Sequence, residues 1–238
     1  MILKLPKSFK LYTNSFLIES SQKVKTTSKL RIYRAIVAFI LVTHLILMLA
    51  LDKSKYLKNI FFFTHWGYWM VTVYFIINTI KDYDTKQIKK VSSLFHVSLS
   101  ASLFVAIGFW MILIPIILNL AYTGNFSNDE FRFSGNIYPI YKTFYLHTFP
   151  TLSICIDSYY NKFQMNYGSF TKWFNIVIAY TLKNFFATKF MGIEIYPGFD
   201  YMSLKCYFAV FCGFLISISC WYLPLKMKQE RGKTSFFI

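Results

Sequence analysis

Six long apolar stretches restrict what this chain can fold into. Each comes close to the roughly 20 residues that an α-helix needs to cross the hydrocarbon core of a bilayer. Hydrophobic residues make up 55% of the 238 positions and charged residues 15%, a balance typical of polytopic membrane proteins rather than soluble domains. We therefore predict an all-α membrane protein built as a six-span helical bundle. The expected spans are residues 36–51, 60–80, 94–121, 138–156, 174–190 and 204–225.

The fifth stretch is the weakest of the six. It is short and carries Lys183 and Asn184, so an interfacial or re-entrant helix is an alternative there. The four cysteines all fall in or beside apolar stretches, without the spacing of a metal site or a disulfide framework. We expect them to be packing residues, and we expect no metal and no cofactor.

Basic residues set the expected orientation. The formal net charge is +16, and the lysines and arginines cluster between the apolar stretches, without a zinc-finger, RNP or helix-turn-helix pattern. Nucleic acid is therefore not an expected partner. By the positive-inside rule both termini are cytoplasmic. We expect a basic cytoplasmic segment at 1–34, the membrane domain at 35–225 and a cytoplasmic tail at 226–238.

One glycosylation sequon agrees with this orientation. Asn125, with Phe126 and Ser127, falls in the loop that the charge pattern places on the non-cytoplasmic side. A chance tripeptide in a polar loop explains it equally well.

His147 lies in the middle of the fourth expected span. An ionisable side chain at that depth costs several kcal/mol unless protein or a wet cavity surrounds it, so an intramembrane histidine indicates a working site. His44 and His96 lie nearer the ends of their spans, where we expect the imidazole to reach the interface. His147 has no such escape.

Thr64 is a candidate partner of His147, which it can meet if their two helices are neighbours. In a six-span topology the second and fourth spans both start on the non-cytoplasmic face, which puts Thr64 about 7 Å and His147 about 14 Å below it, at 1.5 Å per residue. A hydroxyl beside an imidazole is the minimal nucleophile and base for acyl transfer. The alternative is a hydroxyl bonded back to its own helix, the commonest state of a threonine in a membrane helix.

Three motifs resemble the FAR-17a/AIG-like family of androgen-induced and androgen-dependent membrane proteins. They are Phe62-Phe63-Thr64-His65-Trp66, His147-Thr148-Phe149-Pro150 with Asp157 beyond it, and Gly192-Ile193-Glu194-Ile195-Tyr196-Pro197-Gly198-Phe199-Asp200. The resemblance implies a multi-pass hydrolase of fatty acid esters of hydroxy fatty acids. It also implies that Thr64 is the catalytic threonine and His147 the catalytic histidine. The chain departs from the mammalian members at Phe144, which replaces a histidine, and at His65, which replaces an apolar residue.

The expected reaction is therefore lipid ester hydrolysis inside a membrane, with the endoplasmic reticulum as the expected compartment. Membrane lipid and a long-chain acyl ester are the expected partners, and the oligomeric state is left open. A non-enzymatic transporter or a partner-binding subunit is the alternative function. Added bulk at Gly67 is expected to shorten the accepted acyl chain. The residues expected to line the acyl groove are Phe61, Phe63, Phe144, Leu146 and Phe149.

Overall fold

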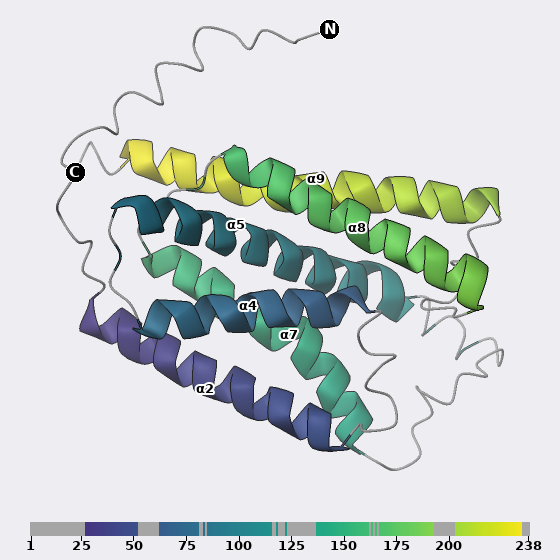
Figure 1. Cartoon of the computed structure of the whole chain (residues 1–238), viewed down its shortest axis with the longest axis horizontal. Coiled ribbons are helices and arrows are strands. Elements are labelled where there is room, and N and C mark those ends of the chain that lie inside the picture. Colours follow the sequence, from purple (N-terminus) through teal and green to yellow (C-terminus); the bar gives the residue numbers. More distant parts are fainter. Residues whose placement is uncertain are drawn as a thin grey trace, which may run out of the picture.

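The fold of the described residues is all-helical (Figure 1). The computed structural model describes residues 27–51, 62–80, 83, 85–115, 118, 122, 137–161, 163, 165, 167–192 and 203–234. Phe61, Asn125 and the motif at 193–200 lie outside this part of the chain. Its helices are α2 (Ser28–Leu51), α4 (Phe63–Ile80), α5 (Thr85–Ile107), the π-helix η2 (Gly108–Leu113), α7 (Ile137–Tyr160), α8 (Gly168–Met191) and α9 (Leu204–Thr234).

The helices alternate in direction along the bundle. Figure 1 shows the start of α2 and the end of α9 at the same end, where α4 also ends and α5 begins. As a result α4 and α7, which are separated in the chain by the oppositely directed α5, run parallel to each other. Both begin at the opposite end of the bundle, so residues early in each helix lie at a similar height.

Three helices in the described part of the chain are long and apolar enough to cross a membrane. They are Ser28–Leu51, Gln87–Ile112 and Leu204–Lys228, and they indicate a membrane protein. The other long helices, α4, α7 and α8, also carry polar side chains, among them Thr64 and Asn78 on α4 and Asn184 on α8. All three of these side chains are buried in the bundle.

The distribution of polarity is the reverse of a soluble protein. Phe39, Phe190 and Leu204 are 72%, 72% and 85% exposed, whereas Arg34 and Asp157 are 1% and 0% exposed. An apolar exterior suits lipid, and ionisable side chains in membrane bundles characteristically face the interior and pair there.

The centre of the bundle is α5, which contacts α4, α7, α8 and α9. Its buried face is rich in small residues, which let neighbouring backbones approach closely. A Cβ added at Gly67 of α4 would lie 3.2 Å from Val105 Cγ2. Gly67 therefore serves the contact between α4 and α5, and bulk there would separate these helices before it could shorten an acyl groove. The small buried residues of α5 are Ser92, Ser93, Ser98, Ser100, Ala101 and Ser102.

Several helix ends differ from the expected boundaries. The first helix begins at Ser28, inside the expected cytoplasmic segment 1–34, and the last helix runs to Thr234, beyond the expected boundary at 225. Apolar windows miss these turns because their polar residues lower the average, although the helix continues through them. α4 begins at Phe63, so Thr64 lies in its first turn rather than about five residues into a span.

Candidate active site

Thr64 and His147 are in direct contact. Thr64 Oγ1 lies 3.1 Å from His147 Nε2, so α4 and α7 are neighbours, which is the condition on which this contact depended. On the other side of the imidazole, His147 Nδ1 lies 2.6 Å from the carbonyl oxygen of Thr143. A carbonyl oxygen can only accept, so Nδ1 is the protonated nitrogen and Nε2 is free to accept from the Thr64 hydroxyl. This is the tautomer that a general base needs.

The position of Thr64 at the start of α4 explains why its hydroxyl turns to His147. Thr72 and Thr79 on the same helix donate to the carbonyl oxygens of Tyr68 and Phe75, at 2.8 and 2.9 Å. Thr64 is the second residue of α4, so no carbonyl of this helix lies four residues before it. The alternative expectation, a hydroxyl bonded to its own helix, is therefore wrong for Thr64.

The first turn of α4 is held by α8. The backbone N–H of Phe63 donates to Tyr180 Oη at 2.9 Å, and the rings of these two residues pack edge to face. The first N–H groups of a helix have no acceptor within it, so such a cap fixes where the helix starts. It thereby fixes the height of Thr64 against α7.

The π-helix that follows α5 orients the imidazole. Phe109, in this π-helix, stacks on the ring of His147 with centroids 3.8 Å apart and an interplanar angle of 16°. Short π-helices are frequent at functional sites, because the wider turn re-aims the side chains that it carries. The Phe109 face and the Thr143 carbonyl together restrain His147, in place of the carboxylate found in many catalytic triads.

An exposed aromatic patch adjoins this histidine. Trp110 and Phe144 are 41% and 44% exposed, and their rings lie 5.2 Å apart. Phe144 also packs edge to face with Phe109, at 6.3 Å, and Phe109 covers His147. A continuous aromatic path therefore leads from the outer surface of the bundle to the base.

The other expected groove residues lie elsewhere. Phe63 is 3% exposed and packs on Phe104, Trp173 and Tyr180, and Leu146 belongs to the same buried core. These two are core residues, which corrects the expectation that they line an acyl groove. Phe149 stacks on Tyr145. Among the expected lining residues that the structure describes, Phe144 is the one that packs on Phe109, the ring that covers His147.

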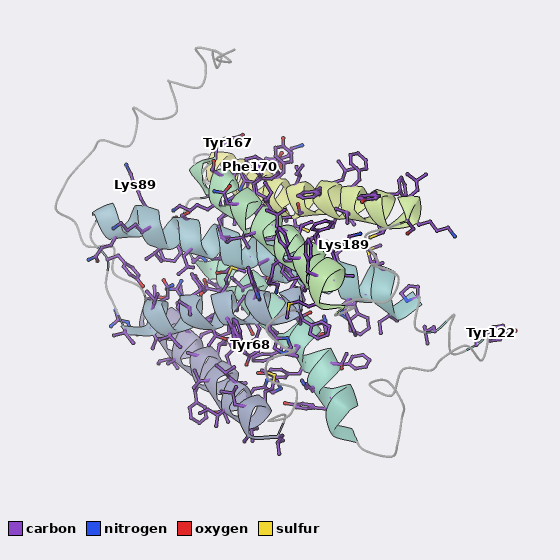
Figure 2. The ribbon with its side chains drawn as sticks, turned by 45° about the vertical axis from the view of Figure 1, so that its right-hand side comes forward. Tyr68, Lys89, Tyr122, Tyr167, Phe170 and Lys189 are labelled. Carbon is purple, nitrogen blue, oxygen red and sulfur yellow. The ribbon has the colours of Figure 1, made fainter. Side chains whose placement is uncertain are left out.

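A second hydroxyl and imidazole pair lies between α5, α8 and α9. Ser169 Oγ is 2.5 Å from His96 Nδ1, and His96 Nε2 is 2.9 Å from the carbonyl oxygen of Trp221. Figure 2 shows Tyr167 and Phe170, which flank Ser169, at the start of α8, where both rings pack on Trp221. His96 and Ser169 are both 0% exposed. This pair is sealed in the core, and His96 does not reach the interface as expected.

His44 does not reach the interface either. It is 4% exposed and stacks on Tyr145, with ring centroids 3.8 Å apart. Tyr68, which lies in the interior in Figure 2, packs on the same imidazole and donates to the carbonyl oxygen of Leu41 at 2.5 Å. The aromatic side chains of α4 and α7 thus enclose this histidine.

Sequence reasoning missed a buried ion pair. Arg34 belongs to the expected cytoplasmic segment 1–34, but its Nε lies 2.6 Å from Asp157 Oδ1 and the two side chains are 1% and 0% exposed. Tyr74 and Asn161 also donate to this carboxylate. The available signal was Asp157 itself, which directly follows the fourth apolar stretch, since an acidic residue buried in a membrane bundle characteristically pairs with a basic one.

Comparisons with protein-family models, with curated proteins and with solved structures find no match for this chain.

Proposed function

We propose that the protein hydrolyses lipid esters within a membrane, with Thr64 as nucleophile and His147 as general base. The observation that carries this proposal is the 3.1 Å contact between Thr64 Oγ1 and His147 Nε2, together with the Nδ1 hydrogen bond that selects the required tautomer. The Ser169–His96 pair has the same two chemical groups, but both side chains are fully buried, so a substrate cannot reach them. His147 is partly exposed, and an aromatic surface adjoins it.

The reaction proceeds in two steps. His147 Nε2 takes the proton of Thr64 as Oγ1 attacks the ester carbonyl carbon, and the bond to the alcohol oxygen then breaks as that oxygen receives the proton. The resulting acyl-threonine is attacked by water, whose proton passes to His147. Collapse of the second intermediate releases the acid and returns the proton to Thr64 Oγ1.

The start of α4 is the proposed source of oxyanion stabilisation. Thr64 lies in the first turn of α4, where the helix dipole favours negative charge. The Phe63 N–H already donates to Tyr180 Oη and the His65 N–H to the Phe62 carbonyl oxygen, so the dipole is the contribution that we propose for this turn. A negative charge at a helix start is typically stabilised by about 0.3–1 kcal/mol, and by more where it is partly buried.

The motifs around Thr64 and His147 favour the FAR-17a/AIG-like family as the proposed affiliation. With it comes the proposed substrate class, fatty acid esters of hydroxy fatty acids, and the endoplasmic reticulum as the proposed compartment. The exposed Trp110 and Phe144 support a long apolar substrate, because an acyl chain in the lipid can reach His147 along them.

Turnover on esters of different length tests this function. We expect the purified protein in lipid nanodiscs to hydrolyse palmitoyl esters much faster than soluble acetyl esters. Trp110→Ala should raise the KM for palmitoyl esters roughly five-fold, which corresponds to about 1 kcal/mol of lost apolar contact. Phe39→Ala, at an exposed aromatic residue of α2, is the control and should leave KM unchanged.

Two outcomes would contradict the proposal. Equal turnover on both ester classes, unaffected by Trp110→Ala, would exclude access through the aromatic patch. No turnover on any ester would leave the transporter or the partner-binding subunit as the function.

We propose that all six helices cross the membrane, with both termini cytoplasmic. The alternating helix directions support this topology, as do Lys29, Lys89 and Lys226, which lie at the end of the bundle where the first helix starts. In Figure 2, Lys89 projects from the start of α5, and Lys189 near the end of α8 belongs to the opposite side.

Tagged variants test this topology. Reporters at either terminus should be accessible from the cytoplasm, and a tag within 124–135 should be protected. A tag at 124–135 that is accessible from the cytoplasm would mean that the true orientation is the opposite of the proposed one.

A further inference from the structure

Two polar contacts join α4 to α7 at the same sequence offset. Thr64 meets His147 and Tyr74 meets Asp157, and both pairs are 83 residues apart in the chain. The two contacts are therefore ten residues apart on each helix, about 15 Å at the helical rise. Equal spacing on two parallel helices means that one axial alignment satisfies both contacts.

The Asp157 contact is the more strongly constrained of the two. Arg34 binds the carboxylate with Nε at 2.6 Å from Oδ1 and Nη2 at 3.2 Å from Oδ2, and Asn161 Nδ2 donates to Oδ2 at 2.7 Å. Tyr74, which is 0% exposed, donates from α4 to the same Oδ2 atom. Charge-assisted hydrogen bonds in a buried site are strong and directional, and losing one leaves a costly unpaired group.

Apolar packing alone holds helix register weakly by comparison. Moving α7 by one residue relative to α4 shifts His147 by about 1.5 Å along the axis and turns it by about 100°. Rings and aliphatic side chains can repack after such a movement, whereas the carboxylate would lose Tyr74. Single buried polar residues are known to specify helix register in this way.

We infer that Asp157 is a positioning residue that acts through Tyr74 to hold α7 in the register where His147 Nε2 meets Thr64 Oγ1. This inference rests on the proposed function, because it assigns the register a catalytic purpose. Asp157 does not contact the reacting atoms. It sets the height of the base from the far end of the same helix, and Arg34 holds the carboxylate against α2.

Tyr74→Phe tests this inference, because it removes one hydroxyl and keeps the ring and the Arg34–Asp157 pair. A misplacement of about 1 Å can cost up to 100-fold in rate, so we expect kcat about ten-fold lower for palmitoyl esters and an unchanged KM. Tyr33→Phe is the matched control. Tyr33 Oη donates to the Ser153 carbonyl oxygen at 2.8 Å, which ties α7 to α2 rather than to α4. Its kcat should stay unchanged.

A cross-linking experiment measures the axial register between α4 and α7 independently of catalysis. Thr64→Cys and His147→Cys are combined in a chain whose four native cysteines are replaced, and a short bifunctional thiol reagent is added. The cross-linking rate should fall several-fold with Tyr74→Phe and stay unchanged with Tyr33→Phe.

An unchanged cross-linking rate in the Tyr74→Phe background would overturn the inference, whatever happens to kcat. An equal loss in both tyrosine variants would overturn it too, because the effect would then be general loosening. If the native chain hydrolyses no ester, the proposed function fails while the cross-linking arm still decides whether Tyr74 holds the register.

Discussion

Thr64→Ala and His147→Ala are each expected to lower kcat for ester hydrolysis by about a thousand-fold or more, with the double variant no worse than either single one. The two side chains share one hydrogen bond, and catalytic groups that act as a unit are strongly non-additive. Steady-state kinetics on the three purified variants measures this directly. Thr64→Ser keeps the hydroxyl and should retain part of the activity.

Labelling by a fluorophosphonate probe separates the nucleophile from a general structural effect. The probe should label the native protein and fail on Thr64→Ala. Ser169→Ala is the matched control, because it removes a hydroxyl bonded to a buried imidazole in the same bundle. Labelling that persists in Thr64→Ala, or that disappears in Ser169→Ala while Thr64 is intact, would refute the assignment of Thr64.

Asp157→Ala is expected to lower the free energy of unfolding by about 3–5 kcal/mol, because it leaves the Arg34 guanidinium buried without its counter-ion. Removing both charges avoids that penalty. Arg34→Met combined with Asp157→Leu should therefore regain most of the lost stability. Thermal unfolding in detergent, followed by fluorescence-detected size exclusion, gives the comparison.

The same double variant also connects stability with register. This double variant has no buried charge at the site of the ion pair, but it also lacks the carboxylate that accepts from Tyr74. We therefore expect a folded protein whose kcat remains low. A single variant as stable as the native chain would show that the ion pair contributes nothing to folding. Full turnover in the stable double variant would show that the Thr64–His147 contact does not depend on Asp157.

Much of the candidate site could be predicted from the sequence. Long apolar stretches predicted helices, and His147 in the middle of one of them stood out because an ionisable group there is costly. The alternation of an up-and-down bundle places the second and fourth helices parallel, so Thr64 and His147 were expected on the same side. Their direct contact depended on α4 and α7 being neighbours, which no local pattern reports.

Local patterns also misjudged where polar side chains lie. His96 was expected at an interface because of its position in a stretch, yet it is enclosed by Ser169 and Trp221. Arg34 was assigned to a cytoplasmic segment, since a basic residue before an apolar run normally marks the cytoplasmic side. A window of hydropathy averages over all faces of a helix, so it cannot distinguish a side chain facing water from one facing another helix.

The sequence by itself determined that the chain is helical and apolar, and it indicated Thr64 and His147 as a candidate pair. Only the tertiary structure decided that Asp157 pairs with Arg34 and Tyr74, that a π-helix places Phe109 on His147, and that α4 and α7 share one register. The physical reason is that helix formation depends on neighbours within a few residues, whereas these contacts join segments up to 123 residues apart. Long-range pairing depends on how all the helices pack together, and a linear pattern does not record that arrangement.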